Sequence, residues 1–441
     1  MRKPVSAQFE ISEGCNYRCE YCYNFFPHSQ SEIRNRLSLP VIQRINRATK
    51  ELVDKIAETD IFSITITGGE PLDNRGVLYY ALEKFRDSLI DVSINSNLSL
   101  LRKEDAKFFR QMGVRSVLAS FLGPNAKTHD QGSRVRGSFY RLTRSLEILA
   151  QQGVRTCVNL VVTKKNVSLV YETGVEMVRR GVSVFAATPV VASQGKDIGS
   201  LLLTPQEVKS VLDSLINVSE STGIDVDTLH PLPPCMFNEH ERERYARFYE
   251  RRGCVAAVGT ITFSPTGDVR VCSHDSRSYG NILHEPLEDI LQRMEEWRSG
   301  GLIPAQCTKC AYVEICRGAC RVSAEALRGE LNSSDIYFAG PVPELQIQKP
   351  QINETGFSQL APLTRNFKVR EDAKGVYTVY ANPLAHATLN EFELSILRRF
   401  LSGATYEQIS SEVNNQKALK KALTKLLFRH ILRPNKKNKT L

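Results

Sequence analysis

The chain has 441 residues, which is too long for one ordinary hydrophobic core and predicts two or three domains. Hydrophobic residues make up 41% of the chain and charged residues 24%, a balance that excludes a disordered protein. No apolar run is long enough to span a bilayer, and the opening residues MRKPVSAQFEI lack the apolar stretch of a secretory signal. We therefore expect a cytoplasmic protein without a membrane partner.

The net charge of +10 favours an acidic partner, such as nucleic acid, an anionic cofactor or an acidic peptide. Part of this surplus lies in the tail RPNKKNKTL, so a solvated basic tail is an equally simple explanation. The chain also contains 11 cysteines, an odd number. Because a reducing cytosol disfavours disulfides, metal ligation is the natural use of these thiols.

Strand-like and helix-like segments alternate over residues 1–225. The β-branched runs are SAQFEIS, FSITITG, DVSINSN, RSVLASF, RTCVNLVVT and VSVFAATPVV, and amphipathic stretches such as NRGVLYYALEKFRDSL lie between them. This alternation predicts a parallel sheet with helical crossovers. Six strands without an obvious reversal predict an α/β fold, a partial (β/α)6 TIM-like barrel with its chemistry at the carboxyl ends of the strands.

Three cysteines follow the first predicted strand, in the stretch EGCNYRCEYCYN. Cys15, Cys19 and Cys22 are separated by three and then two residues. Three thiolates fall one short of a closed zinc site, but they suit a cubane iron–sulfur cluster that leaves one iron open to another ligand. On spacing alone, a zinc knuckle or unligated thiols remain alternatives.

Further motifs end the next strands and are expected on the same rim of the barrel. GGEP follows the second strand, NSN ends the third, and Ser120 ends the fourth. Gly68 and Gly69 let the backbone approach a ligand closely. Glu70 can accept hydrogen bonds from an ammonium group.

This order of motifs resembles the radical S-adenosylmethionine (SAM) superfamily over residues 6–225. The resemblance implies a [4Fe-4S] cluster on Cys15, Cys19 and Cys22, with S-adenosyl-L-methionine bound at the open iron. In the stretch SFLGPNAKTHD, Leu122 replaces the family's usual Asp, so that part of the match is partial. The residues assigned to cofactor binding by this resemblance are Tyr21, Gly68, Gly69, Glu70, Asn95, Ser120 and Arg134.

A second group of cysteines lies between residues 254 and 320, after the turn-rich linker LHPLPPC. Such a loop-rich module is expected to gain its stability from metal rather than from a large apolar core. It resembles the SPASM extension of radical SAM enzymes that modify peptides and proteins, and two zinc ribbons are the alternative. The resemblance implies one auxiliary iron–sulfur cluster on Cys254, Cys272 and Cys320, and another on Cys307, Cys310 and Cys316.

The second auxiliary site lacks the last cysteine of the family pattern, and Phe338 stands in the lost position. Either Asp335 ligates, water or substrate completes the site, or this cluster is absent. Cys235 is a candidate for the fourth ligand of the first auxiliary cluster, or for a catalytic residue that donates a hydrogen atom. Cys157, within the fifth strand, is expected to be a small core residue.

The last part of the chain is expected to be a separate module after a linker at 341–362. FKVRED and GVYTVYANP predict a hairpin, and Asn390 and Thr405 are expected to cap helices. The segment resembles the leader-recognition domain of peptide-modifying pathways, including the peptide chaperone of pyrroloquinoline-quinone biosynthesis. Such winged-helix-like modules bind a leader peptide by β-augmentation. A DNA-binding winged helix and a structural cap are the alternatives.

These resemblances imply an enzyme with a radical SAM barrel at 1–225, a SPASM domain at 226–340 and a leader-recognition domain at 363–441. A 5′-deoxyadenosyl radical, formed by reductive cleavage of SAM, would abstract hydrogen from a ribosomally made precursor peptide. The expected product is a carbon–carbon or thioether cross-link, or a rearranged backbone. The expected partners are this peptide and a reductant such as flavodoxin or ferredoxin, without nucleic acid. The rivals are a sulfatase-maturase-like enzyme, a peptide epimerase, and an iron–sulfur or zinc regulator that binds DNA.

Overall fold

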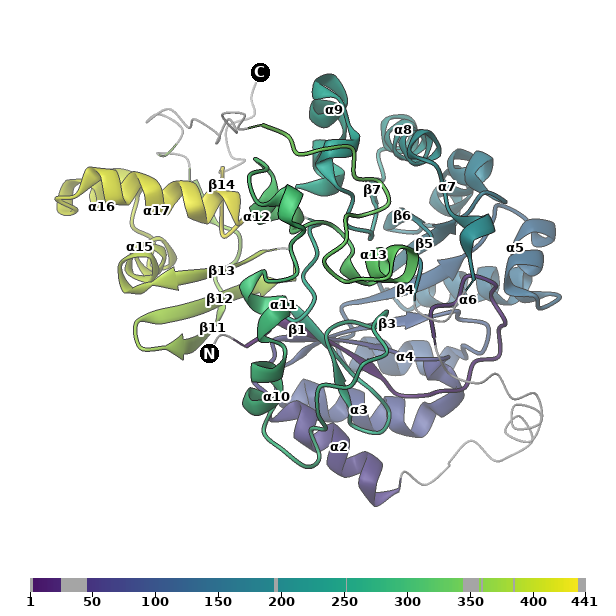
Figure 1. The fold of residues 1–441 in the computed structure, drawn as a ribbon. Helices are drawn as coiled ribbons and strands as arrows, with labels where there is room; N and C mark the ends of the chain where they lie inside the picture. Colours follow the sequence, from purple (N-terminus) through teal and green to yellow (C-terminus); the bar gives the residue numbers. More distant parts are fainter. Residues whose placement is uncertain are drawn as a thin grey trace. The chain divides into compact units, whose positions relative to one another are not determined.

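The chain forms two compact units (Figure 1). The larger unit comprises residues 6–344, and the smaller one comprises residues 1–5 and 345–441. The computed structural model describes residues 3–24, 46–193, 197–250, 252–343, 357, 360–383 and 385–434. Most of the linker expected at 341–362 therefore lies outside the described residues.

A nine-stranded sheet forms the frame of the larger unit, in the order β7-β6-β5-β4-β3-β2-β1-β8-β9. All neighbours from β7 to β8 pair in parallel, and β9 runs antiparallel to β8. The six strands predicted from the β-branched runs are confirmed as β1 to β6. The strands are β1 (Ser6–Glu10), β2 (Ser63–Thr67), β3 (Asp91–Ser96), β4 (Ser116–Phe121), β5 (Thr156–Val162), β6 (Val184–Pro189), β7 (Asp225–Asp227), β8 (Thr260–Phe263) and β9 (Val269–Arg270).

Helices connect the successive parallel strands, because such strands cannot be joined by tight turns (Figure 1). Their apolar stripes pack on one face of the sheet, where Phe85 and Phe109 meet Phe9 and Ile94 in one continuous core. The helices of this layer are α2 (Arg47–Ala57), α3 (Arg75–Asp87), α4 (Lys103–Gln111), α5 (Ala126–Ser133), α6 (Ser138–Gln151), α7 (Val170–Arg179) and α8 (Pro205–Thr222).

The two faces of the sheet differ in polarity. On the helix-covered face, the strands place fully buried apolar residues such as Ile94 and Val158. On the opposite face, Asn95, Ser120 and Asn159 are only partly buried. A parallel sheet is normally apolar on both faces, so this polar face indicates the side on which a ligand is held. Cys157 alternates onto this polar face and is half buried, so the expectation of a core position is wrong.

The cysteine-rich module continues the large sheet, because β8 pairs with β1 in parallel. Phe263, Ile290 and Trp297 of this module belong to the same hydrophobic core as the barrel. The expectation that metal alone would stabilise this module is therefore too narrow. Its helices are α9 (Glu239–Tyr249), α10 (Leu287–Arg293), α11 (Glu295–Ser299), α12 (Val313–Cys316) and α13 (Arg321–Arg328).

Within its described residues, the smaller unit combines a three-stranded antiparallel sheet, in the order β11-β12-β13, with helices α15 to α17 and a separate β10–β14 pair. The predicted hairpin is confirmed, and Asn390 and Thr405 cap their helices through capping boxes. Residues 360–362, expected in the linker, form β10. The elements are β10 (Leu360–Pro362), β11 (Lys368–Ala373), β12 (Val376–Asn382), β13 (Ala385–Asn390), α15 (Glu391–Leu401), α16 (Tyr406–Glu412), α17 (Gln416–Phe428) and β14 (Leu432–Pro434).

Within the described ranges, no helix has both the length and the apolar character needed to cross a bilayer.

Candidate active site

The first cysteine loop lies directly beyond the carboxyl end of β1. The backbone N–H of Tyr17 donates to Cys15 Sγ (3.4 Å), and that of Cys22 donates to the Cys19 carbonyl (3.1 Å). Burial raises the pKa of the Cys15 thiol well above its usual range and that of Cys19 to about 12, and the neighbouring thiols act in the same direction. A positive metal centre, which is the group that the spacing predicts, would favour the thiolate forms of these cysteines.

The GGEP turn packs backbone to backbone against this loop. The Gly69 N–H donates to the Ser12 carbonyl (2.7 Å), and the Glu70 N–H donates to the Gly14 carbonyl (2.8 Å). A Cβ on Gly69 would lie 1.9 Å from the Gly14 oxygen, and Gly68 has a φ of +128°. The two glycines are thus required for the close approach of the cysteine loop, a reason that the motif by itself did not reveal.

Glu70 joins the ends of two strands to the same loop. Its buried carboxylate accepts hydrogen bonds from the Ser96 hydroxyl (2.6 Å) and from the Asn97 N–H (2.8 Å). Burial raises the pKa of Glu70 to about 7. The Asn97 amide in turn donates to Asn16 Oδ1 (2.8 Å) and to Cys15 Sγ (3.8 Å). Asn97 therefore supports a predicted cluster ligand, and sequence reasoning had named only its neighbour in NSN.

Tyr21 and Arg134 both approach Cys19. The Tyr21 hydroxyl lies near the Cys19 thiol, and the Tyr21 ring packs against a small apolar cluster that contains Val190 and Leu201. Arg134 ends α5 in the left-handed region (φ 55°), and its guanidinium lies 3.7 Å from the carboxylate of Glu20. Lys165 Nζ lies 2.7 Å from the same carboxylate. Both cations are thus paired with Glu20 beside the cysteine loop.

The other two predicted cofactor contacts lie on the polar face of the sheet. Asn95 lies on β3 and Ser120 on β4, each partly buried. Ser120 stands opposite Asn159 of β5, whose side chain accepts a hydrogen bond from the Thr188 hydroxyl (2.7 Å). The polar residues of three neighbouring strands thus share one surface near the cysteine loop.

Sequence reasoning missed a buried polar group on the same face. Glu10, the last residue of β1, is ion-paired to Arg270 of β9, and both side chains are buried. Within the described part of the chain, Glu10 Oε1, Arg270 Nε and His274 Nδ1 have no hydrogen-bond partner. The His274 ring lies against that of Tyr23 (4.3 Å between centroids), next to Cys22. The sequence did contain a signal for this group, because the charged residue Glu10 ends a strand that is expected to be buried.

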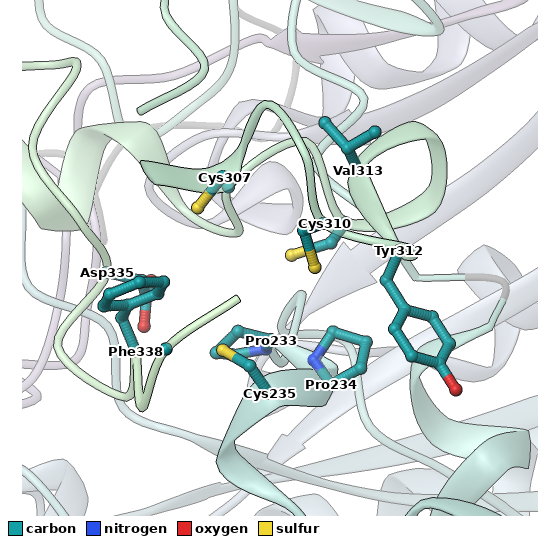
Figure 2. A pocket seen from close by; sticks show the side chains of 12 residues that line it. Pro233, Pro234, Cys235, Cys307, Cys310, Tyr312, Val313, Asp335 and Phe338 are labelled. Carbon is teal, nitrogen blue, oxygen red and sulfur yellow. The ribbon is translucent and has the colours of Figure 1, made fainter. Parts of the chain in front are cut away.

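Apart from Cys157, the remaining thiols form two further groups. Cys254, Cys272 and Cys320 are close enough that each charge would act on its neighbours, and burial raises the pKa of Cys272 to about 12. Cys307, Cys310 and Cys316 line one cavity, together with Cys235, Asp335 and Phe338 (Figure 2).

All the predicted ligands of the three groups are cysteines, which are the usual donors of iron–sulfur clusters. Within the described ranges, no set of three or more Cys, His, Asp or Glu side chains is placed to hold a single metal ion.

Comparison with known proteins agrees with this geometry. Residues 9–168 match the model of the Radical SAM superfamily, and this range contains the first cysteine loop, GGEP and NSN. The chain contains a radical SAM domain. Its cofactors are those of that superfamily, a [4Fe-4S] cluster and S-adenosyl-L-methionine.

The relatives of this radical SAM protein include more than one kind of enzyme. It is 23% identical to the AdoMet-dependent heme synthase of Oleidesulfovibrio alaskensis, over 73% of this chain and 83% of that protein. It is 25% identical to the antilisterial bacteriocin subtilosin biosynthesis protein AlbA of Bacillus subtilis, over 65% of this chain and 59% of that protein. Streptococcus suis SuiB bound to precursor peptide SuiA has the same fold, with a TM-score of 0.59, 15% identity and 76% of both chains covered.

Proposed function

We propose that this radical SAM protein is a peptide maturase that modifies a ribosomally made precursor peptide oxidatively. One observation carries the proposal: a single chain joins the radical SAM cysteine loop to two further groups of thiols and to a separate small unit. When bound, the cluster and SAM would supply reductive cleavage of SAM and, through it, hydrogen abstraction from the peptide.

The residues of this chain bind and orient the reactants. Cys15, Cys19 and Cys22 are the proposed cluster ligands, and the Asn97 amide holds Cys15 in place. Gly68, Glu70, Asn95, Ser120 and Arg134 are the proposed SAM contacts around this loop. Glu70 already accepts hydrogen bonds through both carboxylate oxygens, so we assign it mainly to positioning. The polar face of the sheet then holds the part of the peptide that reacts.

The smaller unit is the proposed site for the leader of the precursor. Its strand β11 is an edge strand, with β12 as its neighbour in the sheet. An added peptide strand would extend the sheet beside β11, as in β-augmentation. Val369, in the middle of β11, is 46% exposed and offers an apolar contact to such a strand. Retention of the leader would raise the effective concentration of the core peptide at the cluster.

A second candidate is chemistry on a porphyrin, because the heme synthases named among the relatives are similar over most of this chain. The thiol groups do not distinguish the two candidates. The separate small unit favours the peptide, since a compact porphyrin needs no additional docking module.

The first part of the test concerns SAM. The chain is purified anaerobically, its clusters are reconstituted, and 5′-deoxyadenosine is measured with SAM and dithionite. We expect reductant-dependent release from the native chain and none from Cys19→Ala. Colourless protein that carries zinc and releases no 5′-deoxyadenosine would overturn the proposal.

The second part concerns the substrate. The chain is co-expressed with a candidate precursor, namely any short peptide encoded beside its gene, and the peptide mass is measured. A loss of hydrogen atoms in pairs supports the maturase. An unchanged peptide, together with SAM-dependent conversion of an added iron porphyrin, would reverse the order of the two candidates.

A further inference from the structure

The cavity around Cys307, Cys310 and Cys316 contains a fourth thiol that the spacing pattern does not provide. We propose that Cys235 is the fourth protein ligand of this auxiliary cluster and replaces the cysteine missing at Phe338. The proposal depends on the radical SAM assignment only for the kind of cluster. It is independent of whether the substrate is a peptide or a porphyrin.

The thiol of Cys235 faces the other three across one space. Figure 2 shows Cys307 and Cys310 on one side of the cavity and Cys235 on the opposite side, and Cys316 belongs to the same lining. Cys235 is close enough for its charge to act on both Cys307 and Cys316, and Cys310 acts on Cys235 in turn. Four thiols around one cavity are the usual donor set of a [4Fe-4S] cluster.

The backbone holds Cys235 in a rigid turn. It lies within the short 3₁₀ turn Pro234–Met236, where the Met236 N–H donates to the Pro233 carbonyl (3.1 Å). Proline fixes φ at two consecutive positions, and Phe237 anchors the following residue in the core at 2% exposure. A preset thiol of this kind is suited to ligation, since little conformational entropy is lost when the cluster binds.

The loop that carries the missing cysteine in the family still reaches this cavity. Phe338 and Gly340 both line it. The ring of Phe338 has no donor atom for iron. Replacement of the missing cysteine at position 338 by Cys235 therefore moves the proposed ligand from one wall of the cavity to another. The loop that contains Phe338 stays in place.

Asp335, the ligand expected as an alternative, is already engaged. It is 2% exposed, and its two oxygens accept hydrogen bonds from the backbone N–H groups of Tyr337 (2.9 Å) and Cys320 (3.3 Å). Iron ligation would compete with these bonds in a buried place. These hydrogen bonds of Asp335 instead connect the 335–338 turn to Cys320, which belongs to the other auxiliary group.

Neither earlier assignment of Cys235 agrees with its neighbours. The charges of Cys307, Cys310, Cys316 and Asp335 interact with that of Cys235. They belong neither to the first cysteine loop, where a hydrogen-atom donor is needed, nor to the group of Cys254 and Cys272. Ligation beside Cys307 is the role that the geometry supports.

The test counts iron and sulfide and records the cluster spectrum of the anaerobic full-length chain. We expect Cys235→Ala to lose iron equivalent to about one cluster, which is about four atoms, or to show an electron paramagnetic resonance signal of a three-iron cluster. Cys157→Ala, which removes another half-buried thiol, is the matched control and should keep the native iron content. Release of 5′-deoxyadenosine should persist in Cys235→Ala, because the first cluster is untouched, and this separates the proposal from the proposed function.

A relocation variant makes the test decisive. The double variant Cys235→Ala/Phe338→Cys should regain the native iron content, since residue 338 lines the same cavity. If Cys235→Ala disturbs folding, Cys235→Ser keeps the side-chain volume, and its altered spectrum reports the same ligand. Native iron content and an unchanged spectrum in both Cys235 variants would overturn the proposal, and lost product formation in them would then support the hydrogen-donor assignment.

Discussion

At the scale of single residues, the first cluster site depends on how closely two backbones approach each other. Gly69 faces the Gly14 carbonyl, and the two hydrogen bonds of the GGEP turn hold the cysteine loop against β2. The GGEP motif, whose glycines let the backbone approach a ligand closely, thus also shapes the loop that carries the thiols. The positions of the three thiols therefore depend on the shape of the GGEP turn.

Gly69→Ala should therefore damage the cluster site. Its Cβ would lie 1.9 Å from the Gly14 oxygen, so one of the two backbones must move. We expect the rate of 5′-deoxyadenosine release to fall by about tenfold or more, which corresponds to ~1.4 kcal/mol. Gly199→Ala is the control, because its nearest contact would be an ordinary 3.6 Å. Equal rates for both variants would contradict this explanation of the glycine.

A second residue-scale prediction concerns His129, which is buried between Phe121 and Phe139. Burial lowers its pKa to about 4, and Asp130 opposes this shift only in part. An unfolded His has a pKa of about 6.5, so below that pH the unfolded chain binds a proton that the folded chain does not. The stabilisation is complete above pH ~6.5 and is lost as the pH falls toward 4.

The free energy of unfolding should thus decrease by up to about 1.4 kcal/mol per pH unit over this range because of His129 alone. His129→Phe keeps an aromatic ring among aromatic neighbours and should flatten the profile. Urea denaturation of the native and variant chains at several pH values measures the two slopes. Identical slopes would show that His129 does not titrate as described.

At the scale of elements, the polar link between β1 and β9 joins the barrel to the cysteine-rich module. Glu10 and Arg270 are both buried, and Arg270 Nη1 also donates to the Asp275 carbonyl (3.1 Å). Removal of one partner from a buried pair leaves an uncompensated charge, which costs about 3 to 5 kcal/mol. The pair is therefore a strong constraint on how β8 and β9 extend the sheet.

Arg270→Met should lower the free energy of unfolding of the larger unit by about 3 kcal/mol. The double variant Glu10→Gln/Arg270→Met should recover part of this loss, because no unpaired charge remains. Arg115→Met is the control, since Arg115 pairs with Asp91 at the surface and should change stability by about 1 kcal/mol or less. Additive losses in the double variant would exclude a coupled pair.

At the scale of the whole molecule, the two units have separate hydrophobic cores. Phe9, Phe263 and Trp297 belong to the core of the larger unit, whereas Val379 and Leu423 belong to that of the smaller one. Each unit can therefore carry its own task. In our proposal, the larger unit performs the chemistry and the smaller one retains the leader.

A chain that ends at residue 343 should keep the first function and lose the second. Its SAM cleavage without peptide should match that of the full chain, because all three thiol groups lie before the cut. The affinity for the full precursor, measured with a fluorescently labelled peptide, should fall by at least about tenfold, or ~1.4 kcal/mol. Unchanged affinity would remove the smaller unit from leader binding, and a core peptide without leader is the matched control.

Local patterns predicted the elements well, for physical reasons that act over a few residues. The β-branched runs of β1 to β6 and the caps at Asn390 and Thr405 depend on neighbours along the chain. The pairing of β8 with β1 joins segments far apart in the sequence, and no local signal reports it. No local signal reports the face of β5 on which Cys157 lies either, because strand alternation allows a residue on either face.

The sequence by itself determined the chemistry of this protein, because the spacing of three thiols and the order of the motifs define which cofactor can bind. Only the tertiary structure decided which thiols share a cavity, as for Cys235 beside Cys307, and which charges meet, as for Glu10 and Arg270. The reason is that ligation and ion pairing act across space. Packing of distant segments, rather than distance along the chain, determines the neighbours of each side chain.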